Sequence, residues 1–182
     1  MMSSKIAPEI DAADICERLV GITPVYLQNF LQRGSYGLRS SVSPGKVRSK
    51  RRLFSPEDVY GIALVWILFE TGLRGDSIAR ILNDIAQTKK PNANLAAAEL
   101  MEFHWQYLLV FFTPRRPSKS IPQESELRVQ LSTFEDLTVH LIVKDPDKGD
   151  EHLMTRENVV IINVPEKFED VRRRLEILFQ LR

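Results

Sequence analysis

The first ninety positions carry hydrophobic residues at helical spacing in four separate stretches. The first stretch predicts a short helix over 11–19, which begins at Asp11, a good helix cap, and ends before Gly21. The second predicts another short helix over 23–34, where Thr23 is the cap and Pro24 takes the first helical position. The apolar residues of this second helix share one side: Leu27, Phe30 and Leu31.

Two further helices follow in the first half. The run Ser55-Pro56-Glu57-Asp58 is the clearest local signal, because a cap, a proline at the first helical position and two acids near the helix N-terminus all predict a helix start. This helix carries the apolar run 59–69 and is expected to stop at Gly72. A fourth helix is predicted over 76–86. Residues 89–92 have the composition of a linker.

The second half begins with a predicted helix over 94–106, and the hydrophobic period then changes to that of strands. Short apolar or alternating runs occupy 107–112, 127–131, 137–143 and 159–164, and an amphipathic helix is predicted over 165–181. We therefore expect an α+β protein with two domains, a helical domain over 1–90 and a small α+β domain over 91–182.

Charge is distributed unevenly along the chain. Residues 1–90 carry 13 Lys or Arg and 9 Asp or Glu, although the whole chain has a net charge of only +1. No acidic residue occurs between Arg33 and Pro56, where a Ser-Pro-Gly turn at 43–45 predicts a hairpin or an ordered loop. The basic residues of this segment are Arg33, Arg39, Lys46, Arg48, Lys50, Arg51 and Arg52. Such a segment is a candidate contact for a polyanion.

Two short helices joined at Gly21 are typical of a helix-turn-helix, in which the second helix enters the major groove of DNA. Tyr26, Gln28 and Asn29 point away from the apolar side of that second helix, so they are candidates for contact with base edges. The basic segment is then placed beside the groove, where it would neutralise phosphates.

These residues resemble the winged helix-turn-helix regulators of the MerR type, over about 14–85. The most specific part is Arg51-Arg52-Leu53-Phe54-Ser55, where the family typically has Tyr-Arg-Leu-Tyr-Ser followed by acids. The resemblance implies that Arg52 contacts the DNA backbone from a wing. Gln28 stands where the family usually has arginine, Asn29 replaces a tyrosine, and the stretch between Gly34 and Arg52 is longer than typical.

The fold class expected is thus an N-terminal winged helix-turn-helix followed by a small C-terminal α+β domain, and the function expected is transcriptional regulation by binding double-stranded DNA. The expected DNA-binding residues are Thr23, Tyr26, Gln28, Asn29, Arg33, Lys46, Arg48, Lys50, Arg51 and Arg52. A homodimer is expected, because one such unit covers only half of a two-fold site. The second domain is assigned to dimerisation, binding of a small-molecule or protein effector, or partner contact. The alternative is a protein-interaction scaffold that reuses the helix-turn-helix, with its function in the C-terminal domain. A third interpretation is an enzyme domain fused to a DNA-binding domain.

Several other classes are disfavoured. The single Cys16 leaves no cysteine cluster for a metal, the three histidines lack ligand spacing, and we expect neither a metal nor a cofactor. No nucleophile with a matched base and no phosphate-binding glycine loop is recognisable, so we expect no enzymatic activity. The longest apolar run, 59–69, is too short to span a bilayer, and no secretory signal is apparent, so a cytoplasmic location without membrane contact is expected. The run Arg172-Arg173-Arg174 is expected to pair with acids of its own helix.

Overall fold

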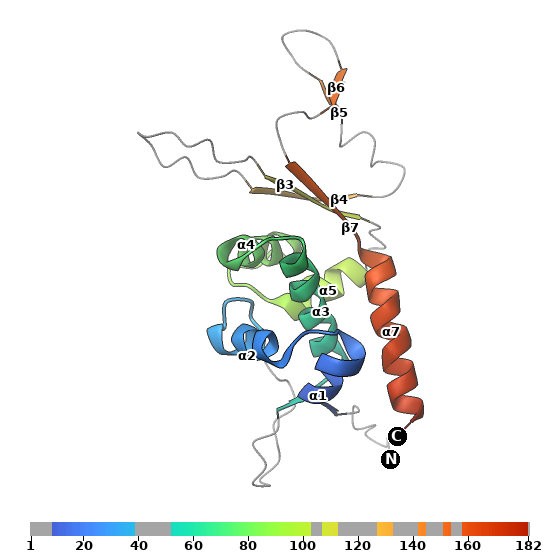
Figure 1. Cartoon of the computed structure of the whole chain (residues 1–182). Coiled ribbons are helices and arrows are strands. Elements are labelled where there is room, and N and C mark those ends of the chain that lie inside the picture. Colours follow the sequence, from blue (N-terminus) through green and yellow to red (C-terminus); the bar gives the residue numbers. More distant parts are fainter. Residues whose placement is uncertain are drawn as a thin grey trace, which may run out of the picture. The chain divides into compact units, whose positions relative to one another are not determined.

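The structure is a computed structural model that describes residues 9–38, 52–102, 107–112, 127–132, 142–144, 151–153 and 158–181. Helices and antiparallel strands both occur in it, as Figure 1 shows, so the expected α+β class is confirmed at this level. The chain forms two compact units, one made of Met1–Glu102 with Lys167–Arg182 and the other of Phe103–Glu166. Each is described by itself.

The first unit is mainly helical. Its elements are α1 (Ala12–Asp14), the π-helical turn η1 (Ile15–Leu19), α2 (Pro24–Arg33), α3 (Pro56–Glu70), α4 (Gly75–Ala86), α5 (Ala93–Glu102) and most of α7 (Val164–Gln180). The helices expected over 11–19, 23–34, 76–86 and 165–181 are confirmed to within about two residues, although η1 departs from regular α-helix. The helix expected over 94–106 ends at Glu102, and 103–106 lie outside the described residues.

Side-chain caps mark where α1 and α3 begin. The N–H of Asp14 donates to Oδ1 of Asp11 (2.9 Å), which starts α1. At α3, the N–H of Asp58 donates to Oγ of Ser55 (3.3 Å) and the N–H of Ser55 donates to Oδ2 of Asp58 (2.8 Å). This reciprocal pair satisfies backbone donors that the first helical turn would otherwise leave without partners. The helix start predicted at residues 55–58 is therefore confirmed.

The core of the first unit is centred on α3, whose apolar side chains are buried on more than one side. Val59, Ile62, Val65 and Leu68 are all fully buried. The stripe of α4 lies in the same core, with Ile78, Ile81, Leu82 and Ile85 buried. Gly61 marks the close crossing of α3 and α5, because a Cβ at this position would meet Oδ1 and N of Asn94.

A two-residue strand pair joins distant parts of this unit. β1 (Ile10–Asp11) pairs antiparallel with β2 (Leu53–Phe54), and Ile10 lies opposite Phe54. Both side chains are fully buried. The chain after the basic segment is thereby held against the residues that precede α1.

Most of α7 belongs to the first unit, and Figure 1 shows it alongside the N-terminal helices. The ring of Phe168 meets Tyr60 of α3 edge to face, with ring centroids 5.5 Å apart, and Nη1 of Arg174 donates to the carbonyl of Leu19 (3.4 Å). The buried side chains that α7 adds to the first unit recur at helical spacing: Phe168, Val171, Leu175 and Leu178. These two units do not coincide with the expected domains 1–90 and 91–182. Whether the two expected domains fold independently stays a prediction.

The second unit contains a three-stranded antiparallel sheet with the order β4-β3-β7. Its strands are β3 (Tyr107–Phe112), β4 (Leu127–Ser132) and β7 (Asn158–Asn163), which agree with expected runs to within one residue. Leu108, Leu109 and Val110 are fully buried, so both faces of the central strand are covered. A second pair joins β5 (Ile142–Lys144) to β6 (Glu151–Leu153). Only the end of the strand expected over 137–143 is described, and β6 was not expected.

Candidate nucleic-acid interface

The candidate interface is built on α2, whose two ends are fixed by local chemistry. The N–H of Tyr26 donates to Oγ1 of the cap Thr23 (3.5 Å), and Pro24 takes the first helical position. At the other end Gly34 has a φ of 60°, a left-handed conformation that suits glycine and stops the helix. The turn before α2 passes through Gly21, as the sequence predicted. The two helices that would form a helix-turn-helix are therefore present, with η1 and α1 as the first.

The outward side of α2 carries an uncharged stripe. Leu27 and Phe30 are buried at 3% and 4% exposure and fix which side faces the core. At 100° per residue the opposite side falls on four positions, which we call the α2 stripe: Val25, Gln28, Asn29 and Gln32. Val25, Gln28 and Gln32 are exposed and Asn29 is half-buried.

Gln32 was not among the residues expected at the interface. Its position could have been found from the sequence, because it lies one helical turn after Gln28 and therefore shares a side with it. The stripe thus adds a third carboxamide to the two that the sequence analysis identified.

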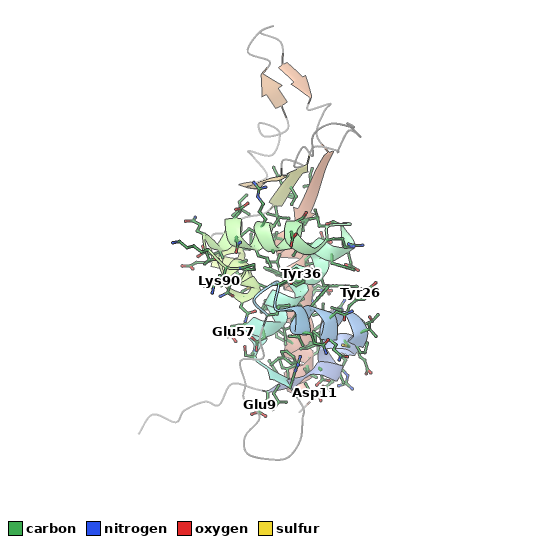
Figure 2. The ribbon with its side chains drawn as sticks, turned by 90° about the vertical axis from the view of Figure 1, so that its left-hand side faces the viewer. Glu9, Asp11, Tyr26, Tyr36, Glu57 and Lys90 are labelled. Carbon is green, nitrogen blue, oxygen red and sulfur yellow. The ribbon has the colours of Figure 1, made fainter. Side chains whose placement is uncertain are left out.

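Tyr26 lies at the edge of the stripe and contacts an aromatic cluster. Its ring centroid is 5.0 Å from that of Phe69 and 5.6 Å from that of Trp66, both on α3. Phe30 and Tyr36 extend the cluster inward, with their rings edge to face at 5.4 Å. Figure 2 shows Tyr26 at the periphery of the helical unit. The side chain is still 40% exposed, so one part of the ring packs on α3 and another part faces solvent.

The same cluster is covered by a cation. The guanidinium of Arg74 lies 3.8 Å from the centroid of the Phe69 ring, and its Nη1 donates to the carbonyls of Phe69 (2.6 Å) and Leu73 (2.7 Å). These bonds satisfy carbonyl groups where α3 ends, so Arg74 is engaged in holding the α3–α4 connection. The orientation of α2 against α3 therefore rests on tilted and edge-to-face ring contacts, and Arg74 holds the Phe69 ring on the outer side.

The described ends of the basic segment 33–52 are held in this unit. Near its start, Leu38 is buried, and the carbonyl of Tyr36 accepts from the N–H of Ala93 (3.0 Å). At its end, Arg52 is exposed and directly precedes strand β2, in which Phe54 is buried. Lys46, Arg48, Lys50 and Arg51 lie outside the described residues, and nothing is described of the Arg33 side chain, although Arg33 ends α2.

The other arginine-rich run of the chain is engaged with acids. On α7, Arg172 contacts Glu169 (2.6 Å) and Glu176 (2.7 Å), and Arg174 contacts Asp170 (2.6 Å). The hydrogen bond from Arg172 lowers the pKa of Glu169, and the same acid raises the pKa of Arg172. The expected pairing within this helix is confirmed for Arg172 and Arg174. Two of the three arginines in this run are therefore paired with acids of their own helix.

Other kinds of site find little support among the described residues. No group of three or more His, Cys, Asp or Glu there is placed to hold a metal ion. Cys16 is buried, and this burial raises the pKa of its thiol, an effect to which the charge of Glu17 adds. Within the described part of the chain no helix combines the length and the apolar character needed to cross a bilayer.

No protein-family model matches the chain, and a comparison with curated proteins finds no match either. Any functional assignment therefore depends on the residues of this chain.

Proposed function

We propose that the chain is a transcriptional regulator that binds double-stranded DNA sequence-specifically through a winged helix-turn-helix of the MerR type. In this proposal α2 enters the major groove, the basic segment 33–52 neutralises phosphates, and no catalytic step is involved. The resemblance of the sequence around Arg52 and the order of the helices in the first unit both favour it.

The observation that carries the proposal is the α2 stripe. Its side chains are one valine and three carboxamides, of which only that of Asn29 is half-buried, although charged residues make up 27% of the chain. Carboxamides donate and accept at once, which suits the mixed donors and acceptors of base edges in the major groove. At that frequency four positions would carry about one charged side chain on average, and the α2 stripe carries none.

The electrostatic part of the proposal concerns the segment between the stripe and β2. Arg52 is exposed, and every charged residue from Arg33 to Arg52 is a lysine or an arginine. Because each phosphate contact releases counterions, binding through this segment should weaken steeply as salt rises. Base contacts from α2 would then supply the preference for one sequence.

A titration of the full chain with a fluorescent duplex at several salt concentrations tests the proposal. We expect binding that weakens with salt, and Arg52→Ala should reduce the slope of log K against log salt by about one for each phosphate that the side chain neutralises. The matched control is Arg80→Ala, an exposed arginine on α4 outside the basic segment. Binding that is absent at low salt would overturn the proposal and favour the protein-interaction scaffold.

We further propose a homodimer that pairs through α5. Leu95 and Met101 are exposed at 45% and 40% on one side of this helix, with the exposed Ala98 between them. Two-fold pairing would place two copies of α2 on successive half-sites. Sedimentation of the wild type against a Leu95→Glu, Met101→Glu double variant tests this, and a wild type that is monomeric with and without DNA would exclude it. The second unit remains a candidate site for an effector or a partner.

A further inference from the structure

We infer that α2 reads a half-site rich in A·T base pairs, with Val25 on a thymine methyl group and the carboxamides of the α2 stripe on adenine edges. The inference rests on the proposed DNA binding and adds the base composition to it. It follows from which side chains the stripe contains and which it lacks.

The side chains that most often bind guanine are missing from residues 24–32 of α2. Arginine or lysine on guanine is the commonest specific contact in the major groove, because O6 and N7 both accept. Residues 24–32 include no charged side chain, and Arg33 comes only at the last position of α2. At 100° per residue, Arg33 also falls outside the α2 stripe, to which Gln32 belongs. The residues placed to read bases are therefore poor partners for guanine.

The residues that are present fit adenine and thymine. Gln28 and Gln32 are exposed on the stripe, and a glutamine or asparagine amide can pair with N6 and N7 of adenine at once. Val25 is 66% exposed at the second position of α2, so its methyl groups are available for an apolar contact. The C5 methyl of thymine is the apolar group that the major groove offers.

The spacing of the stripe sets the size of the half-site. From Val25 to Gln32 the helix advances about 10 Å, since an α-helix rises about 1.5 Å per residue. Stacked base pairs are about 3.4 Å apart along each strand, so this distance corresponds to about three base-pair steps. We therefore expect the A·T preference to extend over about three or four adjacent pairs in each half-site.

The experiment begins with selection of duplexes from a random library by the full chain. The selected duplex is then titrated in three forms: unmodified, with thymine replaced by uracil, and with adenine replaced by 7-deazaadenine. Uracil lacks the methyl group and should weaken wild-type binding about fourfold, as expected for one buried methyl. The modified adenine lacks the N7 acceptor and should weaken it about fivefold or more.

Single substitutions test which side chain causes the loss of affinity for each modified duplex. Val25→Ala should bind the thymine and uracil duplexes equally, and Gln28→Ala should lose most of its sensitivity to 7-deazaadenine at the base it contacts. Ile177→Ala and Gln180→Ala are matched controls, because both residues are exposed on α7 of the same unit and outside the proposed interfaces. Both should keep the wild-type response to each modified base.

The outcomes separate this inference from the proposed function. Salt-dependent binding with selected sites rich in G·C would overturn the inference and leave DNA binding intact. The same would follow if uracil weakened the wild type and Val25→Ala equally. A chain that binds no duplex at any salt concentration would overturn both.

Discussion

Asp58 illustrates how a single buried carboxylate joins two helices. Its side chain is 1% exposed; Oδ2 accepts from the N–H of Ser55 and Oδ1 accepts from Nδ2 of Asn94 on α5 (2.8 Å). A buried charge is tolerated when hydrogen-bond donors surround it. This carboxylate therefore starts α3 and fixes the beginning of α5 at the same time.

Replacing this carboxylate should destabilise the first unit. Asp58→Ala removes both hydrogen bonds and leaves buried donors without partners, so we expect a decrease of about 2–3 kcal/mol in the free energy of unfolding. Urea denaturation of the full chain measures it. Asp84→Ala, an exposed acid on α4, is the matched control and should change stability little. Equal effects of the two substitutions would contradict this role of Asp58.

Cys16 gives a second test at the scale of one residue. Because burial raises the pKa of its thiol, the reactive thiolate should be scarce in the folded chain. We expect slow labelling by a thiol reagent at pH 8 and rapid labelling in denaturant. Since the chain has one cysteine, the signal is unambiguous. Because the thiol ionises at a lower pH in the unfolded chain than in the folded chain, the free energy of unfolding should decrease as the pH rises above the ordinary pKa of a cysteine. Equal labelling rates in native and denatured chains would show that the Cys16 thiol is accessible to the reagent in the folded chain.

At the scale of elements, helix boundaries could be predicted well because their signals are local. Cap residues such as Thr23 and Ser55 act within one helical turn, and a single sequence records them directly. The polar positions of α2 could be predicted for the same reason, since the buried Leu27 and Phe30 determine which side faces outward. The packing of Tyr26 on α3 could not, because it depends on a contact between two helices.

The crossing of α3 and α5 provides a prediction at this scale. In Gly61→Ala the new methyl group would meet Oδ1 of Asn94 and would lie 3.1 Å from its backbone nitrogen, so α5 must shift. We expect a decrease of about 1–3 kcal/mol in stability, measured by urea denaturation. The double variant with Asn94→Ala should be destabilised by less than the sum of the two single variants, because it removes the side chain that the methyl meets. If the decreases in the free energy of unfolding were strictly additive, residue 61 and the Asn94 side chain would not be in close contact.

At the scale of the whole molecule, the contacts that the sequence could not predict join residues far apart along the chain. The strands β1 and β2 have two residues each, too few for an alternating pattern to show, and about forty residues separate them. The amphipathic pattern of α7 predicted a helix but did not indicate which residues its apolar side would cover. The structure places that side in the first unit, against Tyr60 among others.

The packing of α7 gives the last prediction, which also tests the domain boundary expected at residue 90. A chain that ends at Asn163 lacks all five buried apolar residues of α7. Four of them lie in the first unit, and each of these four contributes about 1.5–3 kcal/mol through burial. Their sum is comparable with the whole stability of a domain, about 5–15 kcal/mol. We therefore expect the shortened chain to lose cooperative thermal unfolding of its N-terminal helices, measured by circular dichroism.

Two comparisons make this result specific to the buried side of α7. A chain that ends at Gln180 lacks only the 75% exposed Leu181 and the final Arg182, so it should melt like the full chain. A peptide of residues 164–182 added to the shortened chain should restore cooperative unfolding, because the missing side chains would again cover the exposed core. If the shortened chain melted like the full one without the peptide, the N-terminal helices would be stable without α7, as a boundary at residue 90 requires.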